Sequence, residues 1–476
     1  MKNDYINNFL FVLFAYFFLH VLIRTFISPN IGLDEAEQLL LTQNLSWGYN
    51  AQPPLYTWLQ YLAFELFGTN IFALSILKNT LLFLTYLFVY KSAKIVTKNT
   101  TLALLAMASL LLLPQISWES QRALTHSVLL TTISSVIVYL VMKMKYTISK
   151  IHLGYYLLLG ILISIGLLSK YNFSMFIFAI FIASLLDEKL RSIILKKEFA
   201  ITVFIVIIIL FPHLLWILDN IGTVTGSTMN KLNLENESFS FFIGIAYLFK
   251  AIIAFSTPFI VIVILIFRKS LNKDGNRFLF NFFMIVIVAL VIFMFLTDAT
   301  YFKDRWMQPY FFLMVIYIAS KINIESVRER SILLYFKTIY FVMFIIILGL
   351  IGRVYFPDVS KRYSRLNYPY HQLSKQIKEF GFNQGFIIVE NKIIAGNMKL
   401  NFLRSTVSAE NFEQKVDNSQ QILIVWEREF PEQAKRYQHL IQKQKMIQSK
   451  YLFSDKNNFK LNIALIQNKN STKVVK

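Results

Sequence analysis

Residues 278–296 read FLFNFFMIVIVALVIFMFL, an apolar run that contains no charged side chain. A helix needs about 20 such residues to cross the ~30 Å hydrocarbon core of a bilayer. Runs of the same character lie at 9–23, 201–210 and 340–351. The sequence therefore predicts a mostly α-helical, polytopic membrane protein.

The overall composition agrees with this prediction. Of 476 residues, 56% are hydrophobic and 16% are charged, against roughly 25% charged residues in soluble domains. The net charge of +21 could suggest nucleic acid, but much of the excess lies in short loops between apolar runs, as membrane topology requires. We therefore expect the lipid bilayer, and no nucleic acid, as a partner. The chain has no cysteine, which excludes disulfides and Cys-ligated metal.

Hydropathy predicts about eleven transmembrane helices. No small-residue cleavage site follows the first apolar run, so we expect that run to be retained as the first span. The predicted spans lie near 7–27, 70–90, 101–113, 123–142, 153–169, 172–186, 199–217, 239–267, 278–297, 309–320 and 334–352.

The distribution of Lys and Arg predicts the orientation. Alternate loops are almost purely basic, such as the loop that holds Lys143 and Lys145, and cytoplasmic loops carry such an excess. The other loops mix acids with a few bases and are expected to face outward. The first loop, with Asp34 and Glu35, is one of these. An odd number of spans puts the C-terminus outside as well.

The composition changes at about residue 356. The short apolar runs 386–389 and 422–425 predict buried strands, and 460–467 alternates enough for a third strand. Residues 431–445 predict an amphipathic helix with Pro431 near its start. We therefore predict a membrane domain over 1–355 and a small extracytoplasmic α/β domain over 356–476, which would act as a lid or docking platform.

The first outward loop holds the strongest candidate for chemistry. Asp34 and Glu35 precede a stretch, 36–41, that fits a short interfacial helix. Asp34 could cap that helix, or its carboxylate could take a proton from an attacking hydroxyl or amine. Tyr49 and the stiff segment Gln52-Pro53-Pro54-Leu55 follow in the same loop, and this combination favours the catalytic interpretation.

Cations on the outward side could neutralise a phosphate. Arg122, Lys170, Lys303 and Arg305 are candidates, because an Arg fork suits a phosphate and Lys acts as a point charge. Each could instead be a snorkelling residue at headgroup level. His126 could donate to a phosphate oxygen or relay a proton, or it could be a plain interfacial residue.

The remaining polar residues give weaker signals. Asp34, Glu35 and His126 could converge on a divalent cation, but no short two-ligand motif appears, so no metal ligand is predicted. His213, beside Pro212 and Trp216 at a span end, is expected to be structural.

Several stretches resemble one family of enzymes. The first loop, with GLDEA at 32–36, WGY at 47–49, QPPL at 52–55 and Trp58, resembles the first extracytoplasmic loop of the C-type membrane glycosyltransferases, GT-C. It is most similar to the branch that includes protein O-mannosyltransferases, the lipid A aminoarabinose transferase and the lipopolysaccharide-core galacturonosyltransferases. GLLSKY at 166–171, PHLLW at 212–216 and DRWMQP at 304–309 resemble the last group.

The resemblance implies a GT-C fold and an inverting transfer of a monosaccharide from a polyprenyl-phosphate carrier to an extracytoplasmic acceptor, preferably lipid A or lipopolysaccharide core. It implies the bacterial inner membrane, with the active site and the C-terminal domain on the periplasmic side. Asp34 maps onto the proposed base. The expected substrate-binding residues are Glu35, Tyr49, Gln52, Arg122, His126, Lys170, Tyr171, Asp304 and Arg305.

Two positions depart from the pattern of the family. The aminoarabinose transferases have a Lys where this chain has Gln52, and many members have an acid where it has His126. Two other functions stay open, namely an envelope polysaccharide polymerase or ligase and a transporter of polyprenyl-linked sugars. The sugar and the acceptor are not given by the sequence.

Overall fold

The computed structural model describes residues 2–49, 52–222, 224, 241–298, 300–360, 363–416 and 420–466. The chain forms two compact units that are interleaved along the sequence. The helical unit contains Met1–Phe17, Ser46–Tyr56 and Lys78–Ile346, and the sheet unit contains Phe18–Leu45, Thr57–Leu77 and Ile347–Lys476. The sheet unit thus takes two N-terminal segments in addition to the C-terminal part of the chain.

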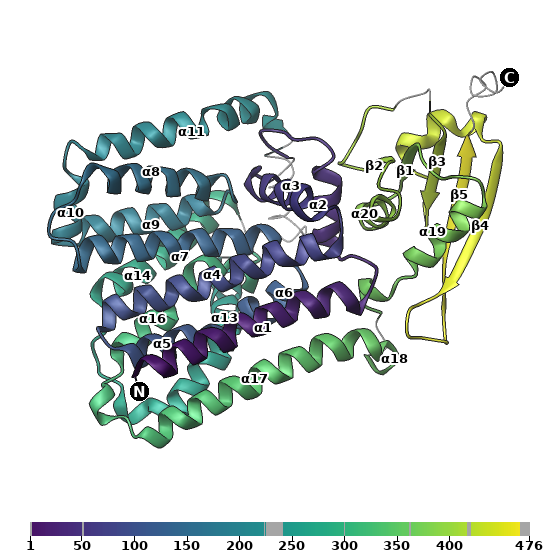
Figure 1. Ribbon diagram of the computed structural model, residues 1–476. Helices are drawn as coiled ribbons and strands as arrows, with labels where there is room; N and C mark the ends of the chain where they lie inside the picture. The colour runs from purple at the N-terminus through teal and green to yellow at the C-terminus, as the bar shows by residue number, and fades with distance from the viewer. Residues whose placement is uncertain are drawn as a thin grey trace. The chain divides into compact units, whose positions relative to one another are not determined.

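Long apolar helices run roughly parallel to one another through the helical unit (Figure 1). Several of them continue into the sheet unit. The helices of the membrane part are α1 (Lys2–Ile27), α3 (Leu55–Phe67), α4 (Ile71–Thr97), α5 (Thr100–Ser109), α6 (Ser120–Arg122), α7 (Thr125–Tyr146), α8 (Leu153–Leu167), α9 (Phe173–Leu185), α10 (Glu188–Ile194), α11 (Phe199–Asp219), α13 (Phe241–Phe267), α14 (Arg277–Thr297), α15 (Gln308–Phe311), α16 (Met314–Lys321) and α17 (Glu329–Tyr355).

The predicted spans that the structure describes are helical, but the count of eleven spans is not confirmed. Within the described ranges, seven helices are long and apolar enough to span a membrane. The helices Thr100–Leu112 and Gln115–Arg122 are bent by 70° relative to each other, and they make an eighth span if the pair is counted as one broken span. Leu153–Leu167 and Phe173–Leu185 are shorter apolar helices. The stretch predicted at 309–320 is broken between α15 and α16, and residues 239 and 240 lie outside the described residues.

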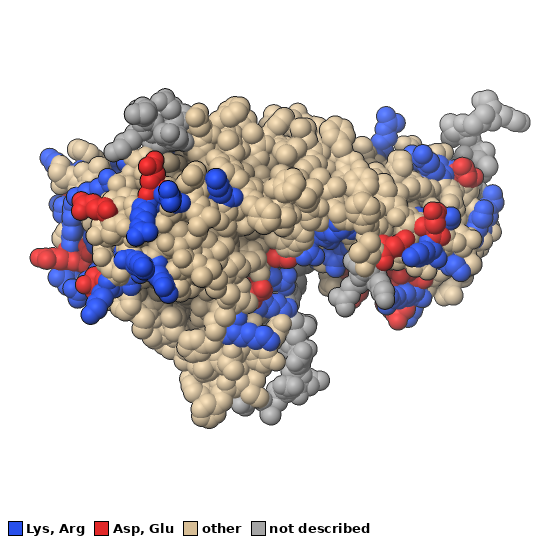
Figure 2. Space-filling model, turned by 90° about the horizontal axis from the view of Figure 1, so that it is seen from below, with Lys and Arg blue, Asp and Glu red and all other residues tan. Residues whose placement is uncertain are grey.

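The surface of the helical unit is suited to lipid. Lys and Arg side chains gather at one end of it, and a broad tan surface without charged side chains covers the adjoining helices (Figure 2). Large apolar side chains of this unit are exposed, including Phe204 (61%), Leu265 (75%) and Leu296 (79%). Contiguous apolar surface on this scale is not stable in water and marks a membrane-facing protein. The chain is therefore an integral membrane protein.

The sheet unit is built around a five-stranded sheet in the order β2-β1-β3-β5-β4. β1 is parallel to β2 and to β3, and the remaining pairs are antiparallel. Phe386 pairs with both Thr406 and Ile422, and Ile424 pairs with Ala464. The strands are β1 (Phe386–Val389), β2 (Thr406–Ala409), β3 (Ile422–Trp426), β4 (Lys443–Lys450) and β5 (Asn458–Ile466).

The two faces of this sheet bury different partners, because side chains alternate along a strand. Ile387 faces a core formed with α19 (Tyr370–Glu379), α20 (Lys392–Asn401) and Leu40 of α2 (Leu33–Leu41). Phe386 and Ile388 face a smaller cluster with the 3-10 helix η7 (Glu432–Leu440). α18 (Pro357–Ser360) follows α17. α2 therefore belongs to the core of the sheet unit although it lies near the start of the chain.

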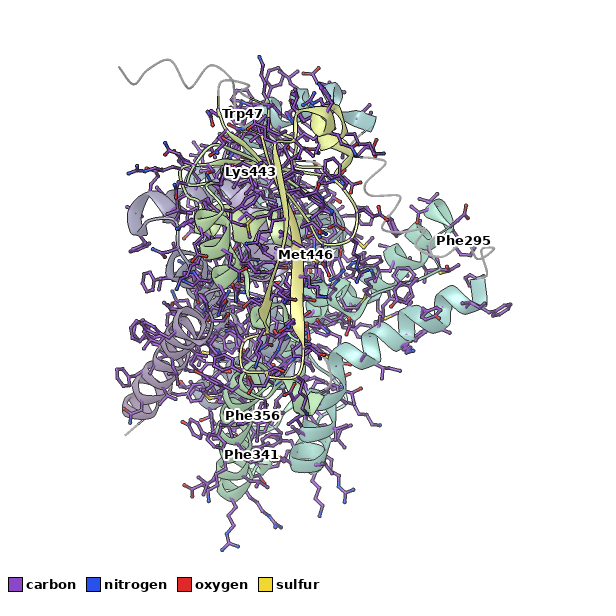
Figure 3. All side chains as sticks on the ribbon, turned by 90° about the vertical axis from the view of Figure 1, so that its right-hand side faces the viewer. Trp47, Phe295, Phe341, Phe356, Lys443 and Met446 are labelled. Atoms are coloured by element: carbon purple, nitrogen blue, oxygen red, sulfur yellow. The ribbon has the colours of Figure 1, made fainter. Side chains whose placement is uncertain are left out.

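One predicted element of the C-terminal part was wrong. The strands expected at 386–389, 422–425 and 460–467 are confirmed, although residue 467 lies outside the described residues. The helix expected over 431–445, however, ends at Leu440 and is 3-10. Residues 443–445 instead begin β4, which pairs with β5 along its whole length. β4 is an edge strand with exposed Lys443 and Met446 (Figure 3). Lys residues on an edge strand usually protect it from pairing with another chain. The polar side chains of β4 also hid the alternating pattern that would have predicted a strand.

Candidate active site

The first-loop segment Ser46–Tyr56 is fastened to the α8–α9 turn of the helical unit. Tyr49 and Gln52 exchange two backbone hydrogen bonds, of 3.0 and 2.7 Å, and the Tyr49 hydroxyl accepts from the Ser46 N–H at 2.9 Å. The N–H of Leu55 donates to the carbonyl of Leu168 at 3.0 Å. Burial raises the pKa of Tyr49. The Pro-Pro segment is thus held beside the turn that carries Lys170.

A stack of rings holds the other end of the segment. His213 of α11 is buried, and its Nδ1 lies 2.5 Å from the carbonyl oxygen of Trp47, to which it must donate. The His213 ring stacks on Tyr171 at 5.9 Å and on Trp216 at 6.0 Å. A Cβ placed on Gly48 would lie 2.2 Å from the Trp216 ring. The structural role predicted for His213 is therefore in agreement with its contacts.

Gly48→Val tests this close approach. The side chain would force Trp216 or the loop to move, and overpacking of this kind typically costs ~1–3 kcal/mol. We expect the purified variant to have a lower thermal midpoint and at least about tenfold lower transfer activity. Gly154→Val is the control, since nothing lies within 4 Å of a Cβ at that glycine. Unchanged activity in Gly48→Val would contradict the docked loop.

Three polar atoms in this region are buried without a hydrogen-bond partner among the described residues: Tyr171 Oη, Asn172 Oδ1 and His213 Nε2. Burial raises the pKa of Tyr171 to about 12, so its hydroxyl remains a donor at neutral pH. A buried polar group without a partner costs ~1–3 kcal/mol. Unpaired buried groups of this kind are rare in native proteins and need an explanation. One explanation is that a polar substrate supplies the missing hydrogen-bond partners.

His126 and Lys170 are brought together on the same side of the helical unit. The Lys170 ammonium donates to Ser127 Oγ at 2.7 Å. His126 Nδ1 lies 3.3 Å from the carbonyl oxygen of Ser169, and its ring is 5.3 Å from that of Tyr56. His126 is buried and Lys170 is half-buried. The two side chains are therefore held in place, one from α7 and one from the α8–α9 turn.

The loop before α7 has an irregular backbone. A π-helical turn covers Gln115–Glu119, and Leu124 adopts a left-handed conformation (φ 69°, ψ 36°). Both features are rare for ordinary residues and recur at functional sites. Arg122, in this loop, pairs with Glu119 at 2.6 Å and lies 5.9 Å from the Trp118 ring.

The same loop reaches the Asp304 loop. Gln115 Nε2 donates to Asp304 Oδ2 at 2.6 Å. Arg305 is exposed, and burial together with the neighbouring Arg305 charge lowers the pKa of Lys303. Within the helical unit, contacts through intervening residues thus link the first-loop segment to His126, Lys170 and Tyr171. The Gln115 and Asp304 loops are joined by one hydrogen bond.

Asp34 and Glu35 belong to the sheet unit. α2 begins after Gly32, whose extended backbone (φ −81°, ψ 179°) makes it the N-cap. The interpretation of Asp34 as N-cap is therefore wrong, because the helix starts earlier than the pattern suggested. Glu35 Oε2 accepts from the Gly32 N–H at 2.7 Å, and both oxygens of Glu35 accept from Arg24, at 2.9 and 2.7 Å. Asp34, one residue before, is half-buried.

The sheet unit fixes α2 by close packing. A Cβ on Gly396 of α20 would lie 2.4 Å from both Cα and Cβ of Ala36. Asn397 Oδ1 accepts from the N–H of Ile31 at 3.0 Å, and Lys392 pairs with Glu37 at 2.6 Å. The helix that carries Asp34 is therefore held from both ends. The sequence analysis did not single out Arg24 or Gly396. Arg24 could have been found, because it is a lone Arg at the end of an apolar run and lies shortly before the acid pair Asp34 and Glu35.

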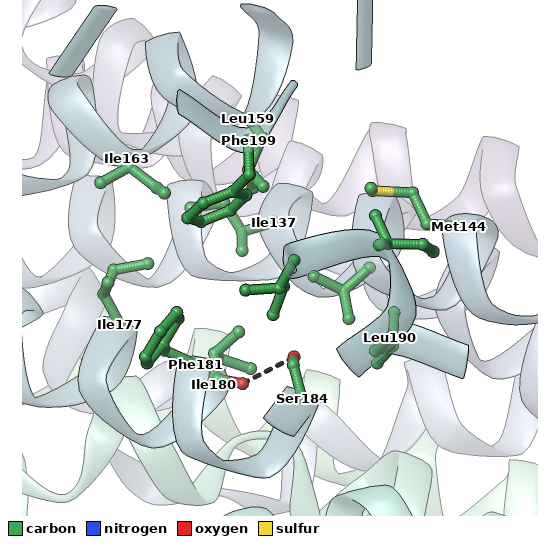
Figure 4. Close-up of a pocket in the computed structure, with 13 residues that line it drawn as sticks. Ile137, Met144, Leu159, Ile163, Ile177, Ile180, Phe181, Ser184, Leu190 and Phe199 are labelled. Atoms are coloured by element: carbon green, nitrogen blue, oxygen red, sulfur yellow. Dashed lines mark hydrogen bonds between the residues drawn. The ribbon is translucent and has the colours of Figure 1, made fainter. Parts of the chain in front are cut away.

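The helical unit also contains a cavity whose lining is almost entirely apolar. This cavity, of about 60 Å³, lies among α7, α8, α9 and α10, and its lining is apolar except for Ser184 (Figure 4). Ser184 Oγ donates to the Ile180 carbonyl at 2.7 Å, so it is already satisfied. Within the described part of the chain, no three His, Cys, Asp or Glu side chains are grouped as metal ligands.

Comparison with known proteins gives concordant results. A profile of the Dolichyl-phosphate-mannose-protein mannosyltransferase family matches residues 51–216. The lipopolysaccharide core galacturonosyltransferases RgtB and RgtA of Rhizobium johnstonii are 31% and 30% identical to this chain; each match covers 87% of this chain, and 86% and 85% of those proteins, respectively.

Solved structures share the fold. ArnT from Cupriavidus metallidurans bound to undecaprenyl phosphate superimposes with a TM-score of 0.65 at 12% identity, over 96% of this chain and 98% of that chain. Its apo state gives 0.64 at 11% identity with the same coverage. At these identities the likeness shows the fold alone.

The fold and the relatives define the class: the protein is a membrane glycosyltransferase with the GT-C fold. Within this class, the chain belongs to the family of the lipopolysaccharide core galacturonosyltransferases, since it is 31% identical to one of them across most of both chains. The resemblance first noted in the loop around Asp34 is thereby confirmed.

Proposed function

We propose that this enzyme transfers a single hexuronic acid, or a closely related monosaccharide, from a polyprenyl-phosphate carrier to lipopolysaccharide core or lipid A. The reaction takes place at the periplasmic face of the bacterial inner membrane, where the C-terminal domain also lies. The observation that carries the proposal is the 31% identity to a lipopolysaccharide core galacturonosyltransferase over 87% of the chain.

The proposed chemistry is a direct displacement with inversion. An acceptor hydroxyl attacks the anomeric carbon, Asp34 takes the hydroxyl proton, and the bond from that carbon to the carrier phosphate breaks. The phosphate leaves with the electron pair of that bond. Because it is already a tolerable leaving group, the enzyme chiefly positions the partners and neutralises charge.

Basic and polar side chains of the helical unit are proposed to bind the phosphate. Lys170 is held by Ser127, and His126 by the Ser169 carbonyl, so both are preorganised. Arg122 and Arg305 supply further charge from the neighbouring loops. Tyr49, Gln52, Tyr171 and Asp304 are proposed to contact the sugar or its phosphate. Glu35 is proposed to position α2, since Arg24 and the Gly32 N–H occupy its oxygens.

Mass spectrometry of lipopolysaccharide tests the function. A strain that lacks the gene is expected to lose one monosaccharide mass from lipid A or core, and the purified enzyme is expected to restore it from a polyprenyl-phosphate-linked sugar. Loss of a whole polysaccharide chain would instead indicate a polymerase or ligase. Movement of the carrier across vesicles without a glycosidic product would indicate a transporter.

Lys170→Met tests the phosphate role. Removing one charge-assisted contact should lower kcat/KM for the donor by about 10- to 100-fold, or ~1.4–2.7 kcal/mol. Lys170→Arg should retain most of the activity. Ser127→Ala removes only the hydrogen-bond partner and should have a smaller effect. If Lys170→Met leaves donor kinetics unchanged, Lys170 does not bind the phosphate.

A further inference from the structure

The sheet unit contains a polar pocket of about 150 Å³, and none of the residues that line it has been proposed above to act on the donor or in catalysis. It lies where the C-terminal end of α2 meets α3 and α20, three helices that pack around one apolar core. Its polar lining comes from Thr42, Gln43, Tyr61, Glu65 and Lys399, and its apolar lining includes Phe64. Most of its accessible lining is polar, which is unusual for a packing defect between helices.

Lys399 is fixed at one side of this pocket. Its ammonium donates to the carbonyl oxygens of Leu403 and Ser405, at 2.9 and 2.8 Å. Burial lowers the pKa of Lys399. A lysine ammonium has three N–H donors, so one donor remains for a group inside the pocket.

Glu65 and Tyr61 of α3 also line the pocket. The neighbouring Glu65 carboxylate raises the pKa of Tyr61. Glu65 and Lys399 line one small pocket, yet the described residues show no ion pair between them within 4.0 Å. Two opposite charges that share a pocket without pairing leave room for a ligand that hydrogen-bonds to both.

The chemistry of the lining selects the class of ligand. A phosphate or another anion would be attracted by Lys399 but repelled by Glu65. A neutral sugar has hydroxyl groups that donate to a carboxylate and accept from an ammonium, and it has C–H faces that pack on aromatic rings such as Tyr61 and Phe64. Gln43 is held by Val407 through both its amide oxygen and its amide nitrogen, so this wall of the pocket is rigid.

We propose that this pocket binds a neutral sugar unit of the acceptor glycolipid, apart from the residues that handle the donor. The proposal rests on the proposed function. It assigns recognition of the acceptor to the sheet unit, and it gives the C-terminal domain a role in acceptor selection.

Two variants of α3 test the pocket with the full-length enzyme in detergent. Glu65→Ala and Tyr61→Phe each remove a group that faces solvent and should not unfold the protein; thermal midpoints check this. We expect KM for the lipopolysaccharide acceptor to rise about tenfold, with KM for the donor and kcat at saturating acceptor within about twofold of wild type. Lys443→Ala, on the exposed edge strand β4, is the control and should leave all three constants unchanged.

Direct binding separates this inference from the proposed function. Lipid-free core oligosaccharide, titrated calorimetrically into the enzyme, should bind wild type and bind Glu65→Ala about tenfold more weakly. Inorganic phosphate at equal concentration should not compete. If acceptor KM and oligosaccharide affinity match wild type in both variants while Asp34→Asn is inactive, the pocket assignment is overturned and the function stands. Competition by phosphate that disappears in Lys399→Met would also overturn it, in favour of an anion site.

Discussion

Asp34→Asn is expected to abolish sugar transfer while leaving the amount of enzyme in the membrane unchanged. A positioned general base contributes typically ~10²–10⁴-fold to the rate, and an amide cannot take the proton of the attacking hydroxyl. The substitution keeps the size of the side chain, the N-cap of α2 is Gly32, and Arg24 pairs with Glu35. The measurement is kcat of the purified variant, together with its yield from membranes.

The matched control lies one turn along the same helix. Glu37→Gln removes a carboxylate from α2 at the cost of a partly exposed pair with Lys392, which is worth at most ~1 kcal/mol. Its kcat should stay within about twofold of wild type. A normal kcat in Asp34→Asn would remove the base assignment, and equal losses in both variants would mean that the helix tolerates no change of charge.

The membrane part of the fold was predictable because one physical signal dominates it. An uncharged run such as 278–296 has few alternatives to a spanning helix, and α14 (Arg277–Thr297) covers it. Likewise, the strand at 386–389 is wholly apolar, which indicates a strand that is buried on both faces. β4 is stabilised by its pairing with β5, and its polar side chains give no strand pattern, so the helix predicted over 431–445 wrongly included its first three residues.

The candidate site was predictable by residue type but not by arrangement. The pattern proposed Asp34, His126 and Lys170 as candidates, which stay predictions, but contacts such as Lys170 with Ser127 join residues far apart in sequence. Hydrophobic periodicity within one helix or strand does not indicate contacts of this kind. The packing of α2 in the sheet unit depends on the absence of a side chain at Gly396, which lies against Ala36. A single glycine in a helical stretch of sequence does not indicate which residue packs against it.

Arg24→Met is expected to destabilise the enzyme by about 3–5 kcal/mol, the usual cost of breaking a buried ion pair. The side chains of Arg24 and Glu35 are only 11% and 8% exposed, and two hydrogen bonds join them. Without Arg24, the Glu35 carboxylate would stay buried and would keep the hydrogen bond from the Gly32 N–H but lose its positive partner. It would then take up a proton or move outward, and either change disturbs the first turn of α2, where Asp34 lies. The measurement is the thermal midpoint in detergent alongside kcat.

A double variant separates loss of the pair from loss of the helix cap. In Arg24→Met/Glu35→Leu no buried charge remains, and replacing a buried pair with apolar groups is often close to neutral. The Gly32 N–H, however, would lose its acceptor, at a cost of ~1–3 kcal/mol. We therefore expect the thermal midpoint of the double variant to lie between that of Arg24→Met and that of wild type. Its kcat should recover only to the extent that the first turn of α2 is restored. A double variant less stable than Arg24→Met would show that Glu35 acts mainly as the cap of α2, with Arg24 secondary.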